Sequence, residues 1–142
     1  MQSAGQFVRI ITMDTRNSPP NSKHVLVVDD DIELTRTWQE LLQAHDYRAS
    51  TAATGVQALR LVMSCNVDAI LCDLSMPELA GNLFYFAVGR VRPQLLKRFT
   101  FVTANADNPL YETFLKSVKV PVFAKPVSFD RLLERLKAVI GN

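Results

Sequence analysis

Apolar residues along this chain occur in short runs that alternate with stretches of helical spacing. The first run, Val25–Val28, is β-branched and too short for a helix, so it predicts a buried strand. After it, Leu34, Trp38 and Leu41 recur at the spacing of one helix face. Similar short runs predict four further strands, at 47–53, 69–72, 99–103 and 122–124.

Helix signals lie between these strands. Gly55 precedes a stretch whose apolar residues share one side, and a second stretch over about 82–91 stops before Pro93. Asn108 is a good N-cap because Pro109 follows it at the first helical position. Ser128 precedes the clearest amphipathic pattern, which continues to the end of the chain.

Strand and helix therefore alternate five times, which predicts an α/β fold with a parallel sheet and helices on both faces. We expect this domain to occupy residues 23–142 and residues 1–22 to form a tail or linker, because Asn17–Ser22 is rich in turn residues. Within the tail, Phe7–Ile11 is β-prone and fits either an extra edge strand or the end of a preceding domain.

Composition excludes several function classes. The net charge is only +2 and the basic residues are scattered, which argues against direct nucleic-acid binding. No stretch reaches the ~20 apolar residues of a membrane span, and the N-terminus lacks a signal-peptide layout. Cys65 and Cys72 are interpreted as free thiols in a reducing compartment. We therefore expect a cytoplasmic protein.

Charged and hydroxyl side chains follow the predicted strands. Asp29 and Asp30 follow the first strand, Asp73 the third and Lys125 the fifth, and Thr103 ends the fourth. Ligands of open doubly wound sheets bind outside the carboxyl ends of the strands. If the first and third strands are neighbours, the three carboxylates converge in one pocket.

Three carboxylates that lie close together repel one another. A Mg²⁺ ion resolves this repulsion because it prefers oxygen ligands, including carboxylates and phosphate oxygens. A metal ion, a free carboxylate, an ammonium and a hydroxyl together suit the transfer of a phosphoryl group onto an aspartate. The sequence thus predicts a Mg²⁺-dependent phosphoryl acceptor.

Four motifs in the expected order make residues 23–142 resemble the receiver domain of two-component response regulators. They are VLVVDDD at 25–31, DLSMPELAG at 73–81, FVTAN at 101–105 and FAKPV at 123–127. The resemblance implies a flavodoxin-like (βα)5 fold with strand order 2-1-3-4-5. It also implies a signalling switch that catalyses only its own phosphorylation and dephosphorylation.

The resemblance assigns roles to particular residues. Asp73 would be the phospho-acceptor, and Mg²⁺ would be held by Asp29, Asp30, Asp73 and the backbone carbonyl of Ser75. Thr103 would be the switch hydroxyl. Lys125 would be the pocket lysine, with a cis bond to the proline that follows it.

The same resemblance implies partners. The phosphodonor would be a histidine kinase or a histidine phosphotransfer protein. An output protein would bind the face formed by the helix after Asn108, the strand 122–124 and the last helix, near Leu110, Tyr111 and Phe114. FVTAN and the segment FLKSVKVPVFAKPV are similar to receivers attached to hybrid histidine kinases. We interpret the chain as an isolated receiver and leave its origin open.

One position departs from the family pattern. Most receivers carry Tyr or Phe three residues before the pocket lysine, where this chain has Val122. Phe123 is a poor substitute because adjacent strand residues face opposite ways. Ser75 and Asn105 occupy positions that tune acyl-phosphate hydrolysis in the family.

Two alternative functions fit parts of the sequence. Asp29-x-Asp31 imitates the opening motif of haloacid dehalogenase-type phosphohydrolases, but these need a further acidic pair on a strand after the lysine. After Lys125 the chain offers only Asp130 and Glu134, near or within the last helix. The other alternative is a receiver-fold interaction module that works without phosphorylation, and Val122 argues mildly for it.

Overall fold

The computed structural model describes Pro19 and residues 21–140. The expected tail at 1–22, with its β-prone run Phe7–Ile11, lies almost entirely outside the described residues. In the described part, strands and helices alternate as expected. The strands are β1 (His24–Val28), β2 (Arg48–Ala52), β3 (Ala69–Cys72), β4 (Phe99–Thr103) and β5 (Val122–Ala124). The helices are α2 (Ile32–Ala44), α3 (Gly55–Ser64), α4 (Gly81–Val91), α5 (Pro109–Ser117) and α6 (Phe129–Ile140).

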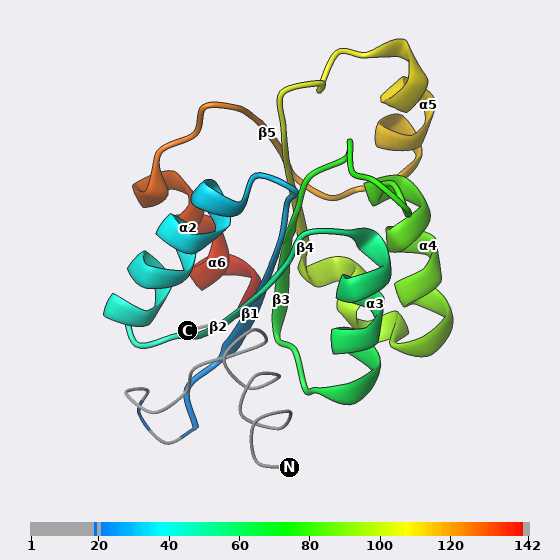
Figure 1. The fold of residues 1–142 in the computed structure, drawn as a ribbon. Coiled ribbons are helices and arrows are strands. Elements are labelled where there is room, and N and C mark those ends of the chain that lie inside the picture. Colours follow the sequence, from blue (N-terminus) through cyan, green and yellow to red (C-terminus); the bar gives the residue numbers. More distant parts are fainter. Residues whose placement is uncertain (1–18, 20, 141–142) are drawn as a thin grey trace.

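The strands form one parallel sheet in the order β2-β1-β3-β4-β5. The central strands β1, β3 and β4 are buried throughout, as their continuous apolar runs predict. Helices α2 and α6 cover one face of the sheet, and α3, α4 and α5 cover the other (Figure 1). The flavodoxin-like fold and its strand order are therefore confirmed.

Alternate residues of each central strand point into two separate cores. Leu26 and Val28 of β1 pack with α3 and α4, whereas Val25 and Val27 pack with α2 and α6. This division follows from the period of two along a strand. It fixes the orientation of the strands, and with it the side chains that can reach the carboxyl edge of the sheet.

The predicted helix caps are present. Asn108 accepts a hydrogen bond from the Leu110 backbone amide, and Ser128 accepts one from the Arg131 amide. Thr54 caps α3 in the same way. The sequence interpretation did not anticipate the short 3₁₀ helix η1 (Pro93–Arg98), which fills the connection after α4.

Neither described cysteine is in a disulfide, since both Cys65 and Cys72 are free thiols. Among the residues that the structure describes, no helix has both the length and the apolar character that crossing a membrane requires.

Candidate functional site

Neighbouring strands bring the predicted carboxylates together at the carboxyl edge of the sheet. Val28 pairs with Cys72 in the β1–β3 register, so the next residues, Asp29 and Asp73, lie side by side. The Asp73 amide extends this ladder by donating to the Val28 carbonyl. One carboxylate oxygen from each of Asp29, Asp30 and Asp73 lies within 4.8 Å of the others. Side chains separated by more than forty positions thus meet because the two strands are adjacent.

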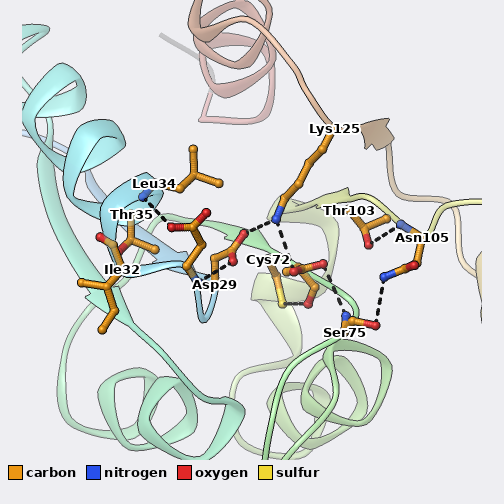
Figure 2. Close-up of polar contacts among 11 residues, drawn as sticks. Asp29, Ile32, Leu34, Thr35, Cys72, Ser75, Thr103, Asn105 and Lys125 are labelled. Atoms are coloured by element: carbon orange, nitrogen blue, oxygen red, sulfur yellow. Dashed lines mark hydrogen bonds and ion pairs between the residues drawn. The ribbon is translucent and has the colours of Figure 1, made fainter.

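Lys125 supplies the positive charge of the site. Its Nζ donates to Asp29 Oδ2 at 2.6 Å and to Asp73 Oδ2 at 3.3 Å (Figure 2). Burial favours the neutral amine, but the hydrogen bond and charge of Asp29, together with Asp73, outweigh burial and raise the pKa of Lys125. The Lys125–Pro126 bond is cis, as the sequence resemblance implied.

The acidic residues differ in their access to solvent. Asp29 and Asp73 are 3% and 6% exposed, whereas Asp30 is exposed. The remaining oxygens of the buried pair accept backbone amides, from Asp31 to Asp29 at 3.0 Å and from Ser75 to Asp73 at 3.3 Å. The pair is thus fixed in place, while Asp30 lies at the mouth of the site.

This donor set fits a hard divalent cation. Three carboxylates face a single ammonium, so the site carries more negative than positive charge. Oxygen ligands and an excess of negative charge are what Mg²⁺ binding requires. Asp31 does not belong to the cluster, because its side chain caps α2 by accepting the Leu34 amide.

The loop after Asp73 folds back onto the site through Gly81. A Cβ atom at this position would collide with the carbonyl oxygen of Asp73, and the Gly81 amide donates to the Leu74 carbonyl at 2.8 Å. Gly81 is the first residue of α4. The two backbone segments approach so closely here that no side chain fits at this position.

Thr103 and Ser75 border the other side of the site. Thr103 is fully buried at the end of β4, and its Oγ1 accepts the Asn105 amide at 3.1 Å. The Asn105 side-chain amide then donates to Ser75 Oγ at 3.1 Å (Figure 2). The structure therefore places every predicted site residue at one edge of the sheet, at the carboxyl ends of β1, β3, β4 and β5.

Sequence reasoning missed one contact at this site. Tyr111 of α5 brings its hydroxyl to 3.2 Å from Ser75 Oγ. The sequence placed Tyr111 near an output surface and gave it no link to the pocket. The sequence does contain one signal for an inward-facing Tyr111. It precedes the buried Phe114 by three residues, and residues at i and i+3 share one helix face.

Val122 and Phe123 face opposite sides of the sheet. Val122 packs on the core beneath α3, α4 and α5, and Phe123 packs on the core beneath α2 and α6. The Arg131 guanidinium lies 4.9 Å from the centroid of the Phe123 ring. The expectation that Phe123 faces the opposite side of the sheet from residue 122 is confirmed.

Comparisons with known proteins agree with this site. The model of the response regulator receiver domain matches residues 25–137. The chain therefore belongs to the response regulator receiver domain family, whose members are signalling switches rather than conventional enzymes.

Curated relatives share this region at moderate identity. Transcriptional regulatory protein ZraR of Klebsiella oxytoca is 32% identical over 118 residues, which cover 83% of this chain and 26% of that protein. Sensor kinase CckA of Brucella abortus is 26% identical over 84% of this chain and 13% of its own length. The chain spans about a quarter of the first of these relatives and less of the second.

Solved structures with the same fold include the receiver domain of a sensor kinase and a chemotaxis response regulator. The receiver domain of a sensor histidine kinase from Pseudomonas aeruginosa, which has a magnesium ion in its active site cleft, superposes with a TM-score of 0.74. It is 27% identical, and the match covers 85% of this chain and 99% of that one. Chemotaxis response regulator CheY4 of Vibrio cholerae is 30% identical, with a TM-score of 0.71 over 84% of this chain and 99% of its own.

Proposed function

We propose that this chain is the phospho-accepting switch of a two-component phosphorelay and that Asp73 is the acceptor. The observation that carries the proposal is Lys125, whose ammonium bridges Asp29 and Asp73 next to the exposed carboxylate of Asp30. A buried carboxylate with an ammonium at hydrogen-bond distance is held in place, as a nucleophile must be.

In the proposed reaction, a phosphohistidine of a kinase or phosphotransfer protein approaches the carboxyl edge of the sheet. An Asp73 carboxylate oxygen forms a bond to phosphorus as the phosphorus–nitrogen bond breaks, and the released imidazole takes up a proton from solvent. Lys125 neutralises charge on the phosphoryl oxygens, and the Thr103 hydroxyl donates to one of them. Water later attacks phosphorus, which returns the Asp73 carboxylate and releases inorganic phosphate.

Asp29, Asp30, Asp73 and the Ser75 carbonyl would hold the Mg²⁺ ion of this reaction. When bound, Mg²⁺ supplies positive charge that offsets the repulsion between the carboxylates and the incoming phosphoryl group. The carboxylate cluster and the magnesium ion in the Pseudomonas aeruginosa receiver support this assignment.

The output would be a change of affinity on the face formed by α5, β5 and α6. A phosphoryl group adds roughly −1.5 to −2 charge, which would draw the Thr103 hydroxyl and shift the loop after β4. The donor and the output protein are expected in the cytoplasm. The relatives include both a transcriptional regulator and a sensor kinase, and either context would fit this switch.

A phosphorylation-independent interaction module is the second candidate, and Val122 favours it, because this residue cannot act as the usual aromatic switch. The two candidates differ in whether the pocket is chemically active.

The test is the intact mass of the protein after incubation with acetyl phosphate, with and without Mg²⁺. We expect one added phosphoryl group that requires both Mg²⁺ and Asp73, so Asp73→Asn should show none. Asp68→Asn is the matched control, because Asp68 is a carboxylate at the opposite end of the sheet. Beryllium trifluoride, a stable phosphoryl mimic, covers the case of rapid hydrolysis. If the wild type neither gains mass nor binds the mimic, the interaction module is favoured instead.

A further inference from the structure

Tyr111 links a surface helix directly to the loop that follows the acceptor. Its hydroxyl lies 3.2 Å from Ser75 Oγ, and the Asn105 side chain donates to the same oxygen at 3.1 Å. Ser75 in turn donates its backbone amide to Asp73 Oδ1 at 3.3 Å. A displacement of Ser75 or Asn105 therefore reaches α5 through the Tyr111 hydroxyl.

Helix α5 is weakly attached to the rest of the domain. Among its residues only Phe114 is buried, whereas α3 buries Gly55, Ala58, Leu61 and Val62. At the start of α5, Leu110 is 80% exposed. Segments with few buried apolar contacts open at low free-energy cost. The hydrogen bond of Tyr111 therefore adds to the packing of Phe114 in holding α5 in place.

Residue 122 cannot provide this link. Val122 packs on the core beneath α3, α4 and α5. As a valine it has no hydroxyl that could form a hydrogen bond to Thr103 or to the loop after β4. Tyr111 has both a ring that packs against that core and a hydroxyl bonded to the edge of the pocket.

We propose that Tyr111 is the positioning residue that couples the pocket to α5, in the absence of an aromatic residue at 122. While Asp73 is unmodified, the Tyr111 hydroxyl holds α5 to Ser75. This inference rests on the proposed function and deepens it, because it names the residue through which phosphorylation regulates the surface of α5.

The steps follow the hydrogen bonds in order. Thr103 Oγ1 accepts the Asn105 amide. When the Thr103 hydroxyl turns toward a phosphoryl group on Asp73, this bond is lost and Asn105 moves. The Asn105 side chain then leaves Ser75 Oγ, the Ser75–Tyr111 bond breaks, and α5 is released.

The experiment is amide hydrogen exchange of α5 in the full chain, with and without Mg²⁺ and beryllium trifluoride. Tyr111→Phe removes the hydroxyl and keeps the ring. Ser75→Ala removes the other partner of the bond, and the double variant tests whether the two act together. Tyr47→Phe is the matched control, since Tyr47 packs in the core on the opposite face of the sheet. Fluorine NMR reports directly whether each variant binds the mimic.

We expect the mimic to speed α5 exchange in the wild type and in Tyr47→Phe. In Tyr111→Phe without the mimic, α5 should already exchange roughly fivefold faster, the effect of losing one ordinary hydrogen bond. Adding the mimic to this variant should then change little. Ser75→Ala should raise α5 exchange similarly, and the double variant should exceed neither single variant.

A purely structural role for Tyr111 would give a different result. In Tyr111→Phe, α5 would then exchange faster both with and without the mimic, and the mimic would still speed exchange as much as in the wild type. This result would overturn the proposed coupling. If the wild type and Tyr111→Phe bind the mimic and respond equally, only this inference is wrong. If the wild type binds no mimic, the proposed function is wrong and the inference is wrong with it.

Discussion

The two ends of the sheet both bury ionisable groups, but they balance them differently. At the amino end, His24 is buried with its ring nitrogens 2.9 Å from the Asn66 carbonyl and 2.6 Å from Ser50 Oγ. Its backbone amide donates to Asp68, whose carboxylate lies 4.0 Å from Arg98. At the carboxyl end, Asp29 and Asp73 share the ammonium of Lys125, and Asp30 adds a third carboxylate to the cluster.

This difference separates a polar cluster whose charges are paired from one whose charges are unbalanced. At the amino end, hydrogen bonds satisfy the imidazole and the carboxylate has a cationic neighbour, so the cluster stabilises the fold and needs no ligand. The carboxyl end keeps an excess of negative charge, which a bound divalent cation would balance. Burial alone therefore does not single out the candidate site, whereas uncompensated charge does.

The largest effect should come from removing the ammonium at the carboxyl end. Lys125→Met keeps much of the side-chain length but leaves Asp29 and Asp73 without their shared donor. We expect phosphoryl uptake from acetyl phosphate to slow by about 10²–10³-fold, the usual cost of losing one group that stabilises transition-state charge. The rate of mass increase measures this effect.

Lys119→Met is the control for that experiment, because Lys119 is an exposed lysine outside the pocket. Its uptake rate should equal that of the wild type. Equal rates in Lys125→Met and the wild type would show that Lys125 has no part in the reaction.

An intermediate effect is expected for the dependence of stability on Mg²⁺, which should distinguish the two ends of the sheet. Asp30→Asn removes an exposed carboxylate from the cluster, so the free energy of unfolding without metal should change by less than about 0.5 kcal/mol. Mg²⁺ should stabilise this variant less than the wild type, because the variant has lost one proposed ligand. A tenfold loss of Mg²⁺ affinity would lower the stabilisation at saturating Mg²⁺ by ~1.4 kcal/mol. Urea denaturation with and without Mg²⁺ measures both quantities.

Asp68→Asn should give the opposite pattern in the same denaturation experiment. It weakens the hydrogen bond to the His24 amide and the attraction to Arg98, which should cost about 1–2 kcal/mol of unfolding free energy. The stabilisation by Mg²⁺ should remain that of the wild type. If Mg²⁺ stabilised Asp30→Asn as fully as the wild type, the proposed ligand set would be wrong.

The smallest effect concerns pH at the amino end. Burial lowers the pKa of His24 below its ordinary 6.5; the Asn66 carbonyl and Asp68 oppose this shift, and the Arg48 charge adds to it. The unfolded chain therefore binds a proton more readily than the folded protein. Stability from the neutral imidazole is present above about pH 6.5 and is lost as the pH falls below that value.

His24→Gln, which cannot titrate, should flatten the dependence of unfolding free energy on pH between about 6.5 and 5. Denaturation curves of both proteins across this range make the comparison. If the unfolding free energy depended on pH equally in His24→Gln and the wild type, His24 would not be the cause of that dependence.

Much of the fold and of the candidate site could be predicted from the sequence because their signals are local. Apolar runs give the strands, and the residue after each run gives the strand tip, so Asp29, Asp73 and Lys125 follow from the alternation and a parallel sheet. The convergence of Asp29 and Asp73 needs only that β1 and β3 are neighbours, which the structure confirms. Lys125 follows β5, beyond β4, and its long side chain reaches both aspartates.

The remaining features depend on distances that a sequence does not contain. His24, Ser50 and Asn66 meet through strand pairing and a loop, and no spacing marks them as partners. Tyr111 reaches Ser75 because α5 lies against the loop after β3, which depends on how that helix packs. Gly81 is required by the approach of its backbone to Asp73, a contact set by the fold.

The most direct test of this account is the position of the phosphoryl group. Borohydride reduces an aspartyl phosphate to homoserine, so peptide mass spectrometry after treatment with acetyl phosphate and Mg²⁺ identifies the acceptor. The account predicts homoserine at residue 73 and aspartate retained at 29, 30 and 68. Homoserine at another of these positions, or an unmodified Asp73 in protein that has gained the mass of a phosphoryl group, would contradict it.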